Sequence, residues 1–191
     1  MQDLYLTSKI PPSVNHYLSY RAIMKNGKPM AASYKPPEVV KYRKEFTQYV
    51  KDECEKQGWD YIHDGLHHFY VDATFYMPRI DMDANNYWKV MLDAITDTQL
   101  VWKDDNVVCE RVNSIYYDSN DPRVELHIYP TDYVGLFDNA SHLEQFQHRC
   151  IGCSRSKRNC SILKKAKAGK VTPDVIDGVC QKYKTKNKGE I

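Results

Sequence analysis

The sequence has no apolar run of the roughly 18 to 20 residues that a helix needs to cross a bilayer. The opening segment MQDLYLTSKI also lacks the basic region and apolar stretch of a secretory leader. Internal repeats and low-complexity tracts are absent as well. These absences exclude a helical membrane protein and a repeat array, and they predict a cytoplasmic protein that has no membrane partner.

What is present is enough apolar material for a core, together with an uneven distribution of charge. Of the 191 residues, 42% are hydrophobic and 12% aromatic, which excludes wholesale disorder. The net charge is only +2, but the segment from His148 onward holds 12 Lys and Arg against 3 Asp and Glu. A segment this basic favours polyanion binding, although a solvated tail would have the same composition.

The pattern of apolar residues predicts alternating strands and helices. Strands are expected over residues 3–10, 68–77, 107–117 and 123–129, a hairpin over residues 21–32, and helices over residues 37–57 and 86–97. Asn26-Gly27 is the turn signal of the hairpin. The last two strands should pair as antiparallel neighbours. This order predicts an α+β domain in which a mixed sheet is packed with helices.

Composition divides the chain into three predicted segments. Residues 1–130 form the α+β domain, residues 131–147 a linker, and residues 148–191 a basic module that carries four cysteines. Within this module, helices are expected near residues 160–168 and 173–183.

The strongest chemical signal is a group of acidic residues. Asp81 and Asp83 are two residues apart at the predicted end of a strand, so both carboxylates would point to the same face. Such a pair repels unless a cation neutralises it, and carboxylate oxygens favour Mg²⁺ or Mn²⁺. Asp105 from a loop and Lys89 from the next helix would complete a site for metal-assisted phosphodiester hydrolysis. Asp and Asn also gather at ordinary surface turns, so the spacing alone leaves both interpretations open.

Several motifs in this order resemble the RusA family of Holliday junction resolvases over about residues 3–130. The matching motifs are Pro11-Pro12-Ser13-x-Asn15-x-Tyr17, a D-x-D before a helix, Asn86-x-x-Lys89-x-x-x-Asp93-Ala94 and Val101-Trp102-x-Asp104-Asp105-x-x-Val108. Members of that family are small, dimeric, Mg²⁺-dependent endonucleases of bacteria, prophages and phages. The resemblance implies a homodimer that acts on branched DNA, in recombination and repair.

The resemblance also implies which residues act. The family's functional residues fall on Asp81, Asp83, Lys89 and Asp105, with the aspartates as metal ligands. The family pattern has four residues from the second aspartate to the lysine, whereas Asp83 and Lys89 are six apart. Either two residues are inserted and Asp81/Asp83 is the pair, or Asp83 takes the first position and Asn85 replaces the second aspartate. Asp83 belongs to the site in both registers.

Other positions of the motifs are expected near the site or the DNA. Asn15 and Tyr17 would lie near the DNA or the site, or would serve only to form the turn, while Asp93 and Asp104 would support the site rather than bind the ion. Asn85 or Asn86 is expected to cap the second helix.

The four cysteines of the basic module predict a second metal site. They are Cys150, Cys153, Cys160 and Cys180. The C-x2-C spacing of the first two is a common half of a structural zinc site, and His148 could replace one ligand. Free thiols, a disulfide or an iron–sulfur cluster would use the same residues.

Three functions remain open on these grounds. The first is a junction-resolving endonuclease that makes paired nicks. The second is a DNA-binding or regulatory protein that keeps the fold without the activity. The third is a nuclease that acts on flaps or replication forks.

Overall fold

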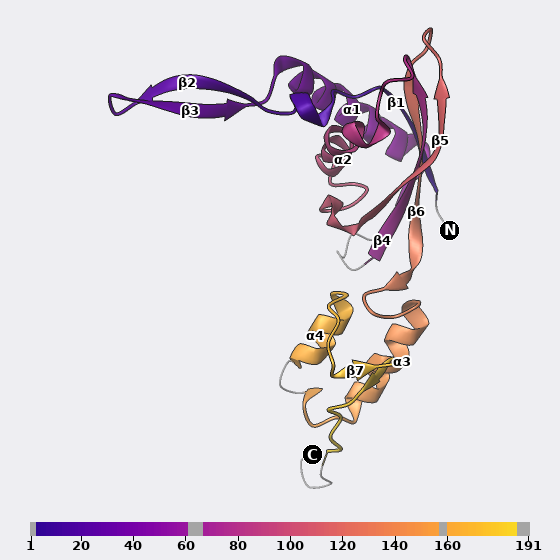
Figure 1. Ribbon diagram of the computed structural model, residues 1–191. Coiled ribbons are helices and arrows are strands. Elements are labelled where there is room, and N and C mark those ends of the chain that lie inside the picture. The colour runs from indigo at the N-terminus through magenta and orange to yellow at the C-terminus, as the bar shows by residue number, and fades with distance from the viewer. Residues whose placement is uncertain (1–2, 61–66, 157–159, 187–191) are drawn as a thin grey trace. The chain divides into compact units, whose positions relative to one another are not determined.

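Figure 1 shows the computed structural model of the chain, which divides into two compact units. The main boundary along the sequence is between Tyr129 and Pro130. The structure describes residues 3–60, 67–156 and 160–186. The first unit holds the described residues up to Tyr129, except His67 and His68, which group with the second.

The first unit contains most of the regular structure; η marks a short 3-10 helix. Its elements are β1 (Leu4–Lys9), η1 (Val14–His16), β2 (Ser19–Lys25), β3 (Lys28–Tyr34), α1 (Pro37–Lys56), β4 (His67–Met77), η2 (Ala84–Tyr87), α2 (Trp88–Thr96), η3 (Asp105–Val107), β5 (Val108–Tyr117) and most of β6 (Arg123–Val134).

A four-stranded mixed sheet organises this unit, with the strand order β1-β6-β4-β5. β1 runs antiparallel to β6, with Leu4 opposite Ile128, and β4 runs parallel to β5, with Phe69 opposite Val108. The predicted α+β fold, a mixed sheet packed with helices, is therefore confirmed.

The predicted antiparallel pairing of the strands over residues 107–117 and 123–129 is wrong. β6 inserts between β1 and β4, so β5 lies at the edge of the sheet and pairs only with β4. Both strands form where expected, because strand formation depends on local alternation. Their partners depend on which apolar faces meet, and the short turn between the strands suggested a hairpin that tertiary packing overrides.

One face of the sheet forms the core with α1 and α2. Alternate residues of β4 are at most 2% exposed: Phe69, Val71, Ala73, Phe75 and Met77. From α1, the side chains of Val39, Phe46 and Val50 are buried in the same cluster or beside it. The Phe75 ring meets Trp88 of α2 edge-on at 5.8 Å between centroids. This packing fixes α2, and the site lies along α2.

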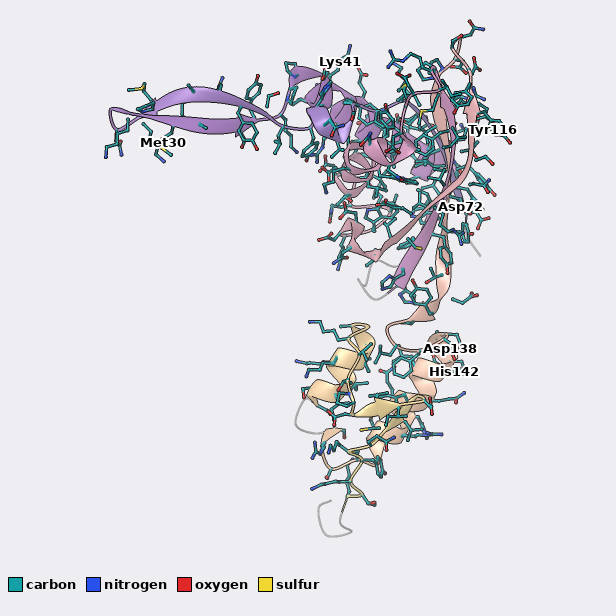
Figure 2. The ribbon with its side chains drawn as sticks, viewed as in Figure 1. Met30, Lys41, Asp72, Tyr116, Asp138 and His142 are labelled. Carbon is teal, nitrogen blue, oxygen red and sulfur yellow. The ribbon has the colours of Figure 1, made fainter. Side chains whose placement is uncertain are left out.

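The opposite face of the sheet is polar and aromatic. Arg111 of β5 donates two hydrogen bonds to the Asp72 carboxylate of β4, at 2.6 and 3.0 Å. The guanidinium also lies 3.8 Å from the centre of the Tyr70 ring. Asp72, labelled in Figure 2, thus helps to hold the edge strand in place.

β2 and β3 form a two-stranded ribbon of their own, and no other strand of the described residues pairs with it (Figure 1). The turn between them has positive φ at Asn26 (53°) and Gly27 (73°), as a two-residue type I′ hairpin requires. The hairpin predicted from Asn26-Gly27 is confirmed, since this turn type depends on local backbone preference alone.

The second unit is smaller. It contains the end of β6 followed by α3 (Ala140–Ile151), α4 (Ser161–Lys167), β7 (Val175–Ile176) and β8 (Val179–Cys180). A small apolar cluster holds it together and consists of Val134, Phe137, Leu143, Phe146 and Ala166. Gly135 has φ of 61° and approaches the carbonyl oxygen of Ala166 so closely that a Cβ would lie 2.4 Å from it.

Two predictions for this region are wrong. The expected linker over residues 131–147 contains the end of β6 and most of α3, because Leu143 and Phe146 pack into the cluster and Asn139 caps the helix. The helix expected over residues 173–183 is the β7–β8 hairpin, whose turn is Asp177-Gly178 with positive φ at both residues. The helix near residues 160–168 is confirmed as α4.

No helix in the described part of the chain is both long enough and apolar enough to cross a membrane.

The packing of α1 allows a matched test, because Val39 is fully buried and the adjacent Val40 is 53% exposed. Val39→Ala should lower the free energy of unfolding by about 2 kcal/mol, through lost burial and a residual cavity. Val40→Ala should change it by less than about 0.5 kcal/mol. Chemical denaturation measures both values, and equal effects would contradict the packing described here.

Candidate active site

Three short turns converge on α2, since η1, η2 and η3 each contact that helix. Each turn begins with a side chain that accepts a backbone N–H two residues later. Ser13 accepts from Asn15 in η1 at 3.3 Å, Asp83 from Asn85 in η2 at 2.9 Å, and Asp104 from Asn106 in η3 at 3.2 Å. These caps hold the turns in a defined conformation around the helix.

Lys89 lies at the centre of the site, between two carboxylates. Its Nζ is 2.8 Å from Asp93 Oδ1 on the same helix and 3.3 Å from Asp105 Oδ2 of η3. The hydrogen bond to Asp93, with a further contribution from Asp105, raises the pKa of Lys89 above its ordinary value. Lys89 therefore remains a cation at neutral pH, and its side chain is 49% exposed. It can stabilise negative charge on a bound phosphate, but it cannot serve as a general base.

Asp93 holds Lys89 in place and is itself held by two other side chains. The Tyr17 hydroxyl donates to Asp93 Oδ2 at 2.6 Å, and Arg43 Nη1 lies 3.3 Å from the same oxygen. Burial alone would raise the pKa of Asp93, but the hydrogen bonds from Lys89 and Tyr17 outweigh it and lower the pKa. The carboxylate is thus ionised, and its side chain is only 14% exposed.

Arg43 connects α1 to the site and was not anticipated from the sequence. It binds the Asp97 carboxylate through Nη2 at 2.5 Å and Nε at 3.0 Å, besides its contact with Asp93. One signal could have revealed it. Arg43 occupies the position between Val39 and Phe46 on the inward stripe of α1, where an apolar residue is usual.

Asp81 and Asp83 lie beyond the end of β4, which stops at Met77 before Pro78. The prediction that strand alternation aligns their carboxylates is therefore wrong, because neither residue is in the strand. Asp81 is in a turn, 67% exposed, and its Oδ1 is 3.2 Å from Arg79 Nε. Asp83 caps η2. The N-cap position of α2 is Tyr87, whose side chain makes no capping hydrogen bond, so the prediction that Asn85 or Asn86 caps the second helix is also wrong.

Both carboxylates lie near the buried Tyr87. Burial raises the pKa of the Tyr87 hydroxyl, Arg79 opposes this, and the charges of Asp83 and Asp81 add to the increase. Asp81 and Asp83 are therefore both within electrostatic range of the same hydroxyl at the start of α2. The two alignments with the family motif, Asp81/Asp83 and Asp83/Asn85, both stay predictions.

Glu110 of β5 is a further acidic neighbour that the sequence did not single out. Partial burial and then the Asp105 carboxylate raise the pKa of Glu110, while Lys89 opposes the shift. Asp105 and Glu110 thus place two carboxylates near a single lysine. In the sequence, Glu110 is an ordinary polar position in a strand, and only the approach of η3 gives it significance.

The described residues contain no group of three or more His, Cys, Asp or Glu side chains spaced to hold an ion by themselves. Mg²⁺ commonly uses one or two carboxylates and completes its shell with water and substrate phosphate oxygens. The exposed carboxylate of Asp83 and the partly exposed carboxylate of Asp105 are donors of the kind that Mg²⁺ prefers, so the chemistry of the residues present fits such an ion.

The network around Asp93 gives a pH-dependent prediction. Asp93→Asn should lower the free energy of unfolding by about 2 kcal/mol near pH 7, because Arg43 and Lys89 would face a neutral amide. The lowered pKa means that Asp93 contributes fully above about pH 4 and loses its contribution as the pH falls through the folded-state pKa.

The difference between wild type and Asp93→Asn, from denaturant titrations at a series of pH values, should therefore shrink on acidification. Asp81→Asn, at an exposed ion pair, is the control and should change stability by less than about 0.5 kcal/mol. A difference for Asp93→Asn that stays constant into strong acid would contradict the network.

Comparison with known proteins agrees with this geometry. The family model described as endodeoxyribonuclease RusA matches residues 10–129, which include η1, α2, η3 and every residue of the site. No curated protein matches the chain. The match ends where the first unit ends, so it does not cover the cysteines of the second unit. The chain therefore belongs to the RusA family of endodeoxyribonucleases.

Proposed function

We propose that this nuclease is a Mg²⁺-dependent, structure-selective endonuclease that resolves four-way DNA junctions by paired nicks, as a homodimer in recombination or repair. One observation carries the proposal. The Lys89 ammonium is held between two carboxylates at a partly exposed site, within the segment that matches the family.

In this proposal each side chain has a separate role in phosphodiester hydrolysis. Asp83 and Asp105 would hold the ion, which supplies Lewis acidity and an activated water when bound. The Lys89 ammonium neutralises charge on the non-bridging phosphate oxygens as the water attacks and the leaving oxygen departs. Asp93 orients Lys89, and Tyr17 with Arg43 orients Asp93. In the register with a two-residue insertion, Asp81 is a further ligand.

Two copies of the chain would account for paired nicks. Each copy carries one site of this kind, and resolution of a junction requires one cut in each of two strands. A dimer therefore places two sites on one branched substrate.

The direct test is cleavage of a synthetic four-way junction with Mg²⁺. Wild type should produce paired nicks, and Asp83→Asn and Asp105→Asn should each reduce the single-turnover rate at least about 100-fold. Lys103→Ala, an exposed lysine near η3, is the control and should cut like wild type. Binding of the junction without cleavage would support a DNA-binding or regulatory protein instead. Cleavage confined to flaps or forks would support the third candidate.

Two variants decide the register. If Asp81 and Asp83 are the pair, Asp81→Asn should lose activity about as completely as Asp83→Asn, while Asn85→Ala should have little effect. If Asp83 and Asn85 occupy the two positions, Asn85→Asp should raise the rate and Asp81→Asn should be nearly silent. Single-turnover cleavage over a range of Mg²⁺ concentrations distinguishes these results.

A further inference from the structure

Four cysteines from separate parts of the second unit line one cavity of about 270 Å³. Cys150 is in α3, Cys153 follows that helix, Cys160 directly precedes α4, and Cys180 is in β8. All four are free thiols. From this convergence we propose that the second unit contains a structural Zn²⁺ site with four thiolate ligands, a property distinct from the nuclease activity.

The backbone around Cys153 suits a metal-bound sulfur. The Cys153 N–H donates to the Cys150 carbonyl at 3.0 Å, and the Ser156 N–H donates to the Cys153 carbonyl at 3.1 Å. The segment after β8 reaches this turn, because the Ser154 N–H donates to the Lys184 carbonyl at 2.8 Å. These backbone hydrogen bonds fix the turn that carries Cys150 and Cys153, as a preorganised pair of metal ligands requires.

The cavity leaves room for the thiols to close on an ion. All four thiols line the same cavity, yet no three of the described ligand-type side chains stand at the spacing of a bound metal. Metal binding would therefore draw the sulfurs inward from the cavity wall.

Such a site would supply stability that the small core lacks. The buried cluster of this unit has five residues, and Cys150 and Cys180 pack against it. In small units of this kind, the free energy of zinc binding contributes directly to folding. Zinc bound at the four thiols would join α3, α4 and the β7–β8 hairpin.

Elemental analysis of the full-length chain, purified under reducing conditions, tests the proposal. We expect about one Zn²⁺ per chain, as a single four-thiolate site requires. Cys153→Ser and Cys180→Ser should lose the metal, and a chelator should lower the melting temperature of wild type but not of these variants. Cys109→Ser, in the first unit, is the control and should retain the metal. Zinc well below one per chain, a disulfide among the four residues, or bound iron and sulfide would overturn the proposal.

A second inference rests on the charge of the β2–β3 ribbon. Between Asp3 and Glu38 the chain has no acidic residue, and three of its five Lys and Arg residues there lie on the ribbon: Arg21, Lys25 and Lys28. A surface with one sign of charge and no internal counter-charge is suited to a polyanion.

The ribbon also exposes large apolar side chains. Tyr20 is 72% exposed, Met24 70% and Met30 48%, and none of them packs into the core of the first unit. Met30, labelled in Figure 2, is on the ribbon near its turn. A lone two-stranded hairpin is only marginally stable in water, so exposed apolar groups on it indicate a surface that a partner covers.

The chemistry of the ribbon favours DNA as that partner. A two-stranded ribbon fits the major groove, its cations can neutralise phosphates, and Met or aromatic side chains can pack against bases that a branch point leaves unstacked. We infer that the β2–β3 ribbon binds a duplex arm of the branched substrate, an inference that rests on the proposed function.

The salt dependence of binding tests this contact. Arg21→Gln, Lys25→Gln and Lys28→Gln are combined in a chain that also carries Asp105→Asn, so that the junction is bound but not cut. The slope of log affinity against log salt concentration should become shallower by up to about 2.7, because each of the three lost phosphate contacts contributes about 0.9. The control combines Lys41→Gln, Lys44→Gln and Lys51→Gln on the exposed face of α1, and its slope should equal that of the parent.

The possible outcomes distinguish a failure of the ribbon–DNA contact from a failure of the proposed function. An unchanged slope with junction binding intact would overturn the ribbon contact alone. A parent chain that does not bind branched DNA would overturn both the contact and the proposed function. Dissociation of a dimer in the ribbon variant, seen by size-exclusion chromatography, would assign the ribbon to a second copy of the chain instead of DNA.

Discussion

The site depends on the carboxylate of Asp93, which is shared by three donors from three elements. One oxygen binds Lys89, while the other accepts from Tyr17 and contacts Arg43. The carboxylate therefore couples η1, α1 and α2 through a single charged group. Lys89 is a long side chain that would otherwise lose considerable rotameric freedom on ordering, and this network holds it at one position. A misplacement of about 1 Å at such a site can cost a nuclease about a hundredfold in rate.

The excess of negative charge at the site makes the basic regions of the surface important for DNA binding under the proposed function. The carboxylates of Asp83, Asp93, Asp105 and Glu110 outnumber the cations Lys89 and Arg43, so the site alone would repel a phosphate. A divalent ion held by the aspartates would reverse the local sign, and under the proposed function other surfaces would attract the DNA first. The chain has two strongly basic regions, the β2–β3 ribbon and the segment from His148 onward. The proposed function thus assigns cleavage to the acidic site and DNA binding to the basic regions.

Local features of the fold were predictable from the sequence, and long-range ones were not. The turn at Asn26-Gly27 and the extent of α1 follow from backbone preference and apolar spacing, which act within a few residues. The place of β6 between β1 and β4 depends on tertiary packing, which no short segment records. The same division holds for the site. The family motifs identified Lys89 with Asp93, whereas Arg43 and Glu110 reach the site only through the packing of α1 and β5 against α2.

In the proposed function, Asp93 positions Lys89 for cleavage without taking part in substrate binding. The most direct measurement is the single-turnover cleavage rate of a four-way junction by Asp93→Asn, together with its junction affinity. We expect a rate about 10- to 100-fold below that of wild type, with affinity changed by less than about threefold and an unchanged cleavage pattern. Cleavage at the wild-type rate by Asp93→Asn would contradict it.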